Sequence, residues 1–102
     1  MKRLLLILGE AMMAAEIINK AKEQLPSWVT EGKLIYKLFE FQSFEKSIVF
    51  TNKVASLAES LDHHPDILIQ YNKVKITCST HDVGGLSIKD IHLAQQIDAL
   101  EI

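Results

Sequence analysis

The sequence contains one cysteine, two prolines and four glycines among its 102 residues. A lone Cys78 excludes an intrachain disulfide and favours a reducing compartment, so we expect a cytoplasmic protein. Cys78 lies in an alternating apolar pattern, which indicates a small core residue rather than a nucleophile. Without a Pro/Gly-rich linker or an internal repeat, the chain is predicted to form a single domain over residues 1–102.

The sequence also lacks a basic excess and a long apolar run. Its net charge is −2 and its lysines are scattered, which argues against a nucleic-acid partner. The N-terminal apolar run covers only Leu4 to Leu8, whereas a membrane span needs ~20 residues and a signal peptide about 7–15. We therefore predict no membrane association. We interpret residues 1–8 as the start of a packed strand or helix, or as sequence ahead of a true start at Met12 or Met13.

The first half of the chain is predicted to contain a helix, two strands and a second helix. Helix-forming residues extend over 10–24, and strands are expected over 28–30 and 33–41 with a turn at Glu31-Gly32. Ser43 can cap the second helix, and Pro65 cannot continue it, so this helix should end at about Asp62. Its apolar stripe recurs at i, i+4, i+7 and i+11. The stripe comprises Phe50, Val54, Leu57 and Leu61.

The second half is predicted to contain a β-hairpin and a last helix. Alternating apolar residues, among which we place Tyr71, indicate strands over 67–71 and 74–78 with a tight turn at Asn72-Lys73. Ser87 and Asp90 have the spacing of a capping box that opens the last helix. The order α-β-β-α-β-β-α predicts an α+β domain, in which helices pack on one face of a four-stranded antiparallel sheet.

Two of the four histidines, His63 and His64, leave the second helix at its end. His81 follows the strand over 74–78, and an antiparallel hairpin would return this end to the start of the strand over 67–71. We therefore expect three imidazoles in one cleft, where Asp62 and Asp82 could orient a ring or hold an imidazolium.

These histidines allow three interpretations. A His-His-Pro sequence is often only a solvated helix exit. Three histidines could bind zinc, but the adjacent side chains of His63 and His64 should diverge, which disfavours a shared metal. Diverging imidazoles suit acid–base catalysis on a bound small molecule. His92 has no histidine at helical spacing and is expected to be a surface or interface residue.

The spacing of this region resembles the signature of the pterin-4a-carbinolamine dehydratase family. The pattern is Glu59-x3-His63-His64-Pro65-x5-Tyr71-x9-His81-x8-Asp90. The upstream elements Trp28 and Phe39-x-Phe41-x-x-Phe44 are also similar to the family pattern, although Ser27 stands where a glycine often precedes the tryptophan. The resemblance covers residues 25–97, and residues 1–8 have no counterpart in it.

The resemblance implies an enzyme that removes water from 4a-hydroxytetrahydropterin and yields a quinonoid dihydropterin. This reaction recycles the pterin of aromatic amino-acid hydroxylases, and the family requires no metal or organic cofactor. An acid must protonate the departing hydroxyl group, and a base must take the proton of the adjacent ring nitrogen.

The resemblance also assigns roles to residues of this chain. His63 and His81 would exchange the protons, and His64 would bind the pterin and stabilise developing charge. Four further positions that match substrate-lining positions of the family are Asp62, Ser79, Thr80 and Asp82. We predict supporting roles for three other signature residues. Glu59 would orient His63, Tyr71 would pack in a strand, and Asp90 would cap the last helix.

The family further implies a homodimer, or a homotetramer built from two dimers. The strand over 33–41 supports self-association weakly, because apolar residues lie on both of its faces. The same fold also serves non-catalytic interaction proteins, which stabilise a transcription-factor dimer or assist enzyme assembly. Retention of His63, His64 and His81 favours the enzyme over this alternative.

Overall fold

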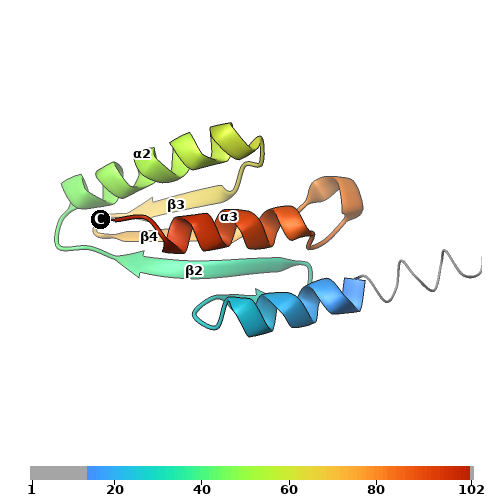
Figure 1. Ribbon diagram of the computed structural model, residues 1–102. Coiled ribbons are helices and arrows are strands. Elements are labelled where there is room, and N and C mark those ends of the chain that lie inside the picture. Colours follow the sequence, from blue (N-terminus) through green and yellow to red (C-terminus); the bar gives the residue numbers. More distant parts are fainter. Residues whose placement is uncertain (1–13, 102) are drawn as a thin grey trace, which may run out of the picture.

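The order of elements in the computed structural model, which describes residues 14–101, follows the predicted alternation of helices and strands (Figure 1). The predictions for residues 1–8 and for a helix start at residue 10 lie outside the described part, and the first helix is described over residues 14–24. The other elements are β1 (Val29–Glu31), β2 (Leu34–Glu40), α2 (Phe44–Leu61), β3 (Asp66–Gln70), β4 (Lys73–Cys78), the 3-10 helix η1 (His81–Val83) and α3 (Ile88–Asp98). Of these, only η1 was not predicted.

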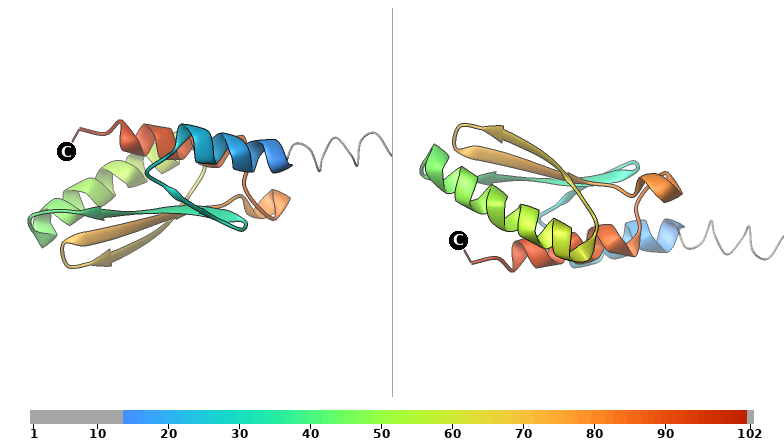
Figure 2. Two further views of the ribbon diagram at one scale, coloured as in Figure 1. Left: turned by 90° about the horizontal axis from the view of Figure 1, so that it is seen from below. Right: turned by 90° about the horizontal axis from the view of Figure 1, so that it is seen from above.

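The four strands form one antiparallel sheet in the order β1-β2-β4-β3. Figure 2 shows the helices on one face of this sheet, so the predicted α+β fold is confirmed. The first strand begins at Val29 and not at the predicted Trp28. The Trp28 side chain is buried and donates a hydrogen bond to Asp98 of α3, which holds Trp28 outside the strand. The turn lies at Gly32-Lys33, where Gly32 has φ +59°.

The core lies between the sheet and the helices, and its residues follow the predicted periodicities. Ile35, Ile76 and Cys78 are fully buried on the helix face of the sheet, which confirms Cys78 as a core residue. Phe50 and Val54 of α2 are also fully buried. Three prominent buried residues of α3 are Ile91, Leu93 and Ile97.

The prediction that Leu61 belongs to the buried stripe of α2 is wrong. Its side chain is 40% exposed, and the buried stripe ends one turn earlier at Ala58. Leu61 is the last residue of α2, at the rim where the chain leaves the helix.

No helix within residues 14–101 has both the length and the apolar character needed to cross a bilayer.

The prediction that Tyr71 packs in a strand is also wrong. β3 ends at Gln70, and Tyr71 lies in the turn with φ +54° and a side chain that is 68% exposed. Asn72 explains this turn, since its carbonyl accepts a hydrogen bond from Phe41 N at 2.7 Å while its Nδ2 donates to Phe41 O at 2.9 Å. Pairing of Gln70 with Lys73 leaves residues 71–72 as the two-residue connection.

Candidate active site

The C-terminal end of α2 turns the chain sharply and directs the two adjacent histidines out of the helix. Asp62 caps α2 in the left-handed region, with φ 50°, and its backbone N–H donates to the carbonyls of Ala58 and Glu59. His63 N also donates to Ala58 O, at 3.1 Å. Aspartate tolerates this conformation better than most residues, and Pro65 cannot extend a helix. The predicted helix end at Asp62 is therefore confirmed.

His63 is held by a buried carboxylate. Its Nε2 lies 2.6 Å from Asp90 Oδ1, and the side chains of His63 and Asp90 are 12% and 0% exposed, respectively. The other oxygen, Asp90 Oδ2, accepts hydrogen bonds from Thr80 Oγ1 at 2.7 Å and from Ser87 N at 3.0 Å. The predicted capping box is thus confirmed. The contact of Asp90 with His63 was not predicted, because no local sequence pattern links residues 27 positions apart.

His64 has a different partner and a different environment. Its Nε2 lies 2.7 Å from Glu59 Oε1, and the two side chains are 58% and 79% exposed. The prediction that Glu59 orients His63 is therefore wrong. The left-handed turn at Asp62 removes His63 from helical register with Glu59 and leaves His64 within its reach.

His81 lies where β4 leaves the sheet. Pairing of Asp66 with Thr77 places the end of β4 beside the start of β3, as the hairpin predicted. An isolated bridge between Thr80 and Gly85 closes the η1 loop, which begins at His81. In Figure 1 this orange loop lies on the same side of the molecule as the end of α2 and the start of α3.

The side chain of Thr80 connects the region of His81 to that of His63. Thr80 donates to Asp90 Oδ2, whose carboxylate contacts His63 Nε2, and His81 follows Thr80 in the chain. His81 is exposed, and within residues 14–101 its ring makes no hydrogen bond to another side chain. Of the remaining residues predicted to line the substrate, Asp62 at the end of α2 and Asp82 in η1 are exposed, and Ser79 after β4 is half-buried.

The arrangement supplies three imidazoles of different exposure around one end of the sheet. Imidazole exchanges protons near neutral pH, so an anchored ring and two exposed rings can act as acid, base and ligand for a small molecule. Among the described residues, no three side chains of His, Cys, Asp or Glu are grouped so that they could hold a metal ion. His92 is exposed on α3, as predicted.

The thiol of Cys78 lies near this network without belonging to it. Burial, and then the negative charges of Asp90 and Asp66, raise the pKa of Cys78 to about 12. A thiol with this pKa stays protonated at neutral pH, whereas the thiolate is the reactive form. This supports the interpretation of Cys78 as a core residue rather than a nucleophile.

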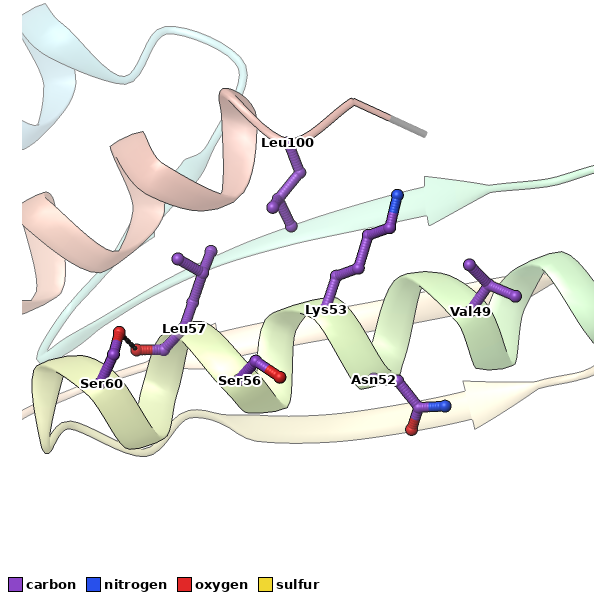
Figure 3. A pocket seen from close by; sticks show the side chains of 7 residues that line it. All are labelled: Val49, Asn52, Lys53, Ser56, Leu57, Ser60 and Leu100. Atoms are coloured by element: carbon purple, nitrogen blue, oxygen red, sulfur yellow. Dashed lines mark hydrogen bonds between the residues drawn. The ribbon is translucent and has the colours of Figure 1, made fainter.

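A separate groove of about 630 Å³ follows the exposed side of α2 (Figure 3). It contains none of the histidines. Val49, Leu57 and Leu100 supply apolar surface to it, and Lys53 at its edge donates from Nζ to Glu101 O at 2.6 Å. The remaining lining residues are Asn52, Ser56 and Ser60. This groove is therefore a second surface feature, distinct from the histidine site.

Comparison with known proteins identifies relatives over most of the chain. The family model described as pterin 4 alpha carbinolamine dehydratase matches residues 10–100. A protein of Prochlorococcus marinus is 50% identical over 78 residues, which cover 76% of this chain and 82% of the relative. A protein of Sulfurisphaera tokodaii is 44% identical over 85 residues, covering 83% and 87% of the two chains. Both are named, provisionally, as pterin-4-alpha-carbinolamine dehydratases.

Two solved structures are similar to the fold. A transcriptional coactivator/pterin dehydratase from Brucella melitensis has a TM-score of 0.74 and 34% identity, covering 80% of this chain and 89% of that one. A pterin dehydratase-like protein, described as a RuBisCO assembly factor in the alpha-carboxysome, has a TM-score of 0.62 and 28% identity, covering 74% and 90%. The matched family model and the identity to these relatives show that the chain belongs to the pterin-4-alpha-carbinolamine dehydratase family.

Proposed function

We propose that this protein removes water from 4a-hydroxytetrahydropterin and yields a quinonoid dihydropterin, in the recycling of a tetrahydrobiopterin-type cofactor in the cytoplasm. Family membership supports the reaction class. The observation that carries the proposal for this chain is the anchoring of His63 by the buried Asp90, in a network that also includes the residue before His81. A solvated helix exit would leave His63 in water, whereas its side chain is only 12% exposed and lies against a fully buried carboxylate.

The reaction needs two proton transfers at neighbouring ring atoms. One histidine accepts the proton of the ring nitrogen, and the electron pair of that N–H bond forms the new C=N bond to carbon 4a. The C–O bond at this carbon breaks as a second histidine protonates the departing hydroxyl group, which leaves as water. The two histidines are reset by exchange of one proton each with solvent. Each positioned proton transfer contributes about 10²–10⁴-fold to the rate.

In this proposal His63 and His81 exchange the protons, and His64 binds the pterin and stabilises charge. Glu59 holds His64 through the hydrogen bond of 2.7 Å between their side chains. Four residues of the α2 exit and the η1 region line the substrate through side chain or backbone. They are Asp62, Ser79, Thr80 and Asp82.

The test follows the decay of freshly prepared 4a-hydroxytetrahydropterin by ultraviolet absorbance, with and without the protein. We expect acceleration by the wild type, a loss of about 10²-fold or more in His63→Ala and His81→Ala, and full activity in His92→Ala. His92 is the matched control, because it is an exposed histidine of α3 outside the site. No acceleration by folded wild-type protein would contradict the proposal, as would His63→Ala and His81→Ala variants that stay within a few-fold of it.

We also propose that the chain forms a homodimer or homotetramer, and that the α2 groove is the self-association surface. Val49 in the groove and Phe44 at the start of α2 are 46% and 51% exposed, so α2 presents large apolar side chains to solvent next to the apolar lining of the groove. Val49→Asp should dissociate the oligomer in sedimentation velocity. Val83→Asp is the control, since Val83 is also exposed but lies in the η1 loop, outside the groove and the sheet. A monomeric wild type at micromolar concentration would overturn the proposal.

The same surface supports a second candidate function, a non-catalytic interaction role of the kind named for the two solved structures. The exposed apolar groove of α2 is the observation that favours it. A stoichiometric complex with one protein partner, lost in Val49→Asp and formed by a protein without dehydratase activity, would make this function the leading one. Full dehydratase activity and no such partner would exclude it.

A further inference from the structure

We infer that Asp90 is a positioning residue that holds His63 as its Nε2–H tautomer, so that Nδ1 is the nitrogen that accepts a proton from the substrate. The capping box at the start of α3 would then have two roles, one in the helix and one in the reaction. The identity of the substrate rests on the proposed function, whereas the tautomer assignment rests on the side-chain contacts alone.

The Asp90 carboxylate acts as a hydrogen-bond acceptor on both of its oxygens. Oδ2 accepts hydrogen bonds from Thr80 Oγ1 and Ser87 N, and Oδ1 lies 2.6 Å from His63 Nε2. An ionised carboxylate can only accept hydrogen bonds, so the proton of this short contact belongs to Nε2. Two donors already occupy Oδ2, so this oxygen carries no proton, and Asp90 is fully buried, which keeps competing water away.

The other ring nitrogen of His63, Nδ1, is left as the proton acceptor. The hydrogen bond made by one nitrogen of a histidine determines which nitrogen carries the proton in the neutral ring. With Nε2 as donor to Asp90, Nδ1 of neutral His63 has a free lone pair, and within residues 14–101 it makes no hydrogen bond. The side chain is 12% exposed, so Nδ1 is the one nitrogen of this ring available to a bound molecule.

His63 and His81 therefore have different roles in the proposed reaction. A ring with a free lone pair accepts a proton, so His63 is the base for the ring-nitrogen proton. Of the two histidines that exchange protons in the proposed function, this leaves His81 to protonate the departing hydroxyl group. His81 is exposed and has no carboxylate partner among the described residues.

The test uses Asp90→Asn, which preserves the size of the side chain. The amide oxygen can keep the hydrogen bonds from Thr80 and Ser87, while the amide nitrogen would donate to Nε2 and force the proton onto Nδ1. An asparagine in place of a histidine-holding aspartate selects the wrong tautomer in this way. We expect kcat to fall about 10²–10⁴-fold with KM within a few-fold of wild type.

The decisive readout is the tautomer of His63, measured by ¹⁵N NMR of the imidazole at a pH where the ring is neutral and assigned with His63→Ala. We expect Nε2–H in the wild type and Nδ1–H in Asp90→Asn. Ser87→Ala is the structural control. It weakens the N-cap of α3 and should lower the melting temperature, but it leaves the contact between His63 and Asp90 and should retain the Nε2–H tautomer.

The outcomes separate this inference from the proposed function. A wild type with the proton on Nδ1 overturns the inference whether or not the protein is a dehydratase, and this measurement needs no variant to fold. A swapped tautomer in Asp90→Asn with unchanged kcat overturns the role in the reaction. The expected tautomers in a protein without dehydratase activity would uphold the positioning by Asp90 and contradict the proposed function.

Discussion

Trp28 Nε1 donates a hydrogen bond of 3.0 Å to Asp98 Oδ2, and this bond joins residues 70 positions apart. The other oxygen, Asp98 Oδ1, accepts from Lys37 Nζ at 2.8 Å, and Lys37 also donates to Ser27 Oγ at 3.0 Å. One carboxylate at the end of α3 therefore ties that helix to β2 and to the segment before β1. Charge-assisted hydrogen bonds of this kind are stronger than neutral ones.

Asp98→Ala should lower the free energy of unfolding by about 1–2 kcal/mol, because the buried indole loses its acceptor and Lys37 loses its ion pair. Urea denaturation measures this change. Gln95→Ala is the matched control on α3, since the Gln95 side chain donates a hydrogen bond to Gln24 at the exposed surface, and it should change stability by less than about 0.5 kcal/mol. Dehydratase activity should persist in both variants, because Asp98 is at the opposite end of α3 from Asp90. Equal stability of the two variants would contradict the assignment.

Tyr71→Gly should be about 0.5–1 kcal/mol more stable than Tyr71→Ala. The positive φ of 54° costs a residue with a Cβ atom, and glycine removes that cost at a smaller entropic penalty. The alanine variant is the control for loss of the side chain, which is 68% exposed and should contribute little packing. Thermal unfolding of the pair tests the conformation of the turn. A glycine variant less stable than the alanine variant would show that Tyr71 does not adopt it.

Stability should fall between pH 9 and 12 more steeply in the wild type than in Cys78→Ala. Burial, aided by the charges of Asp90 and Asp66, raises the pKa of Cys78 from 9.0 to about 12 in the folded protein. Above pH 9 the unfolded thiol loses its proton while the folded one keeps it, so unfolding is favoured by up to about 1.4 kcal/mol per pH unit.

Denaturation of both proteins at several pH values isolates this contribution of Cys78, since all other titrating groups are shared. The cavity left by Cys78→Ala adds an offset that is constant below pH 9. The stability advantage of the wild type should therefore shrink through the window from 9 to 12. Parallel stability curves in that window would contradict a raised pKa for the Cys78 thiol.

Glu59→Gln should reduce kcat/KM only a few-fold, far less than His63→Ala. Glu59 and His64 are both exposed, and a side-chain contact at the surface contributes about 0–1 kcal/mol because water competes for it. Glu45→Gln, in the first turn of α2 and away from the histidines, should leave kcat/KM unchanged. A loss in Glu59→Gln equal to that of His63→Ala would place Glu59 among the essential groups.

Local signals in the chain predicted most of the fold. Apolar periodicity located the strands and helices, Pro65 marked the end of α2, and the spacing of Ser87 and Asp90 marked the start of α3. The errors at Leu61 and Glu59 arose at the end of α2, where the left-handed turn at Asp62 ends the helical register, and the error at Tyr71 arose where a distant contact decides a local conformation. Tyr71 is a residue type that favours strands, and it continues the apolar alternation of β3. The hydrogen bonds between Asn72 and Phe41 nevertheless place Tyr71 in the turn, with a positive φ.

The partners of the histidines depended on the tertiary structure. Local signals alone predicted that His63 and His64 leave a helix together and that the end of β4 returns to the start of β3, because a proline and a hairpin act over a few residues. Docking of α3 against the end of α2 decided that Asp90 holds His63, whereas the left-handed turn at Asp62 placed His64 beside Glu59. Short-range backbone preferences can be read from neighbouring residues, whereas a contact across 27 positions exists only once the elements have packed.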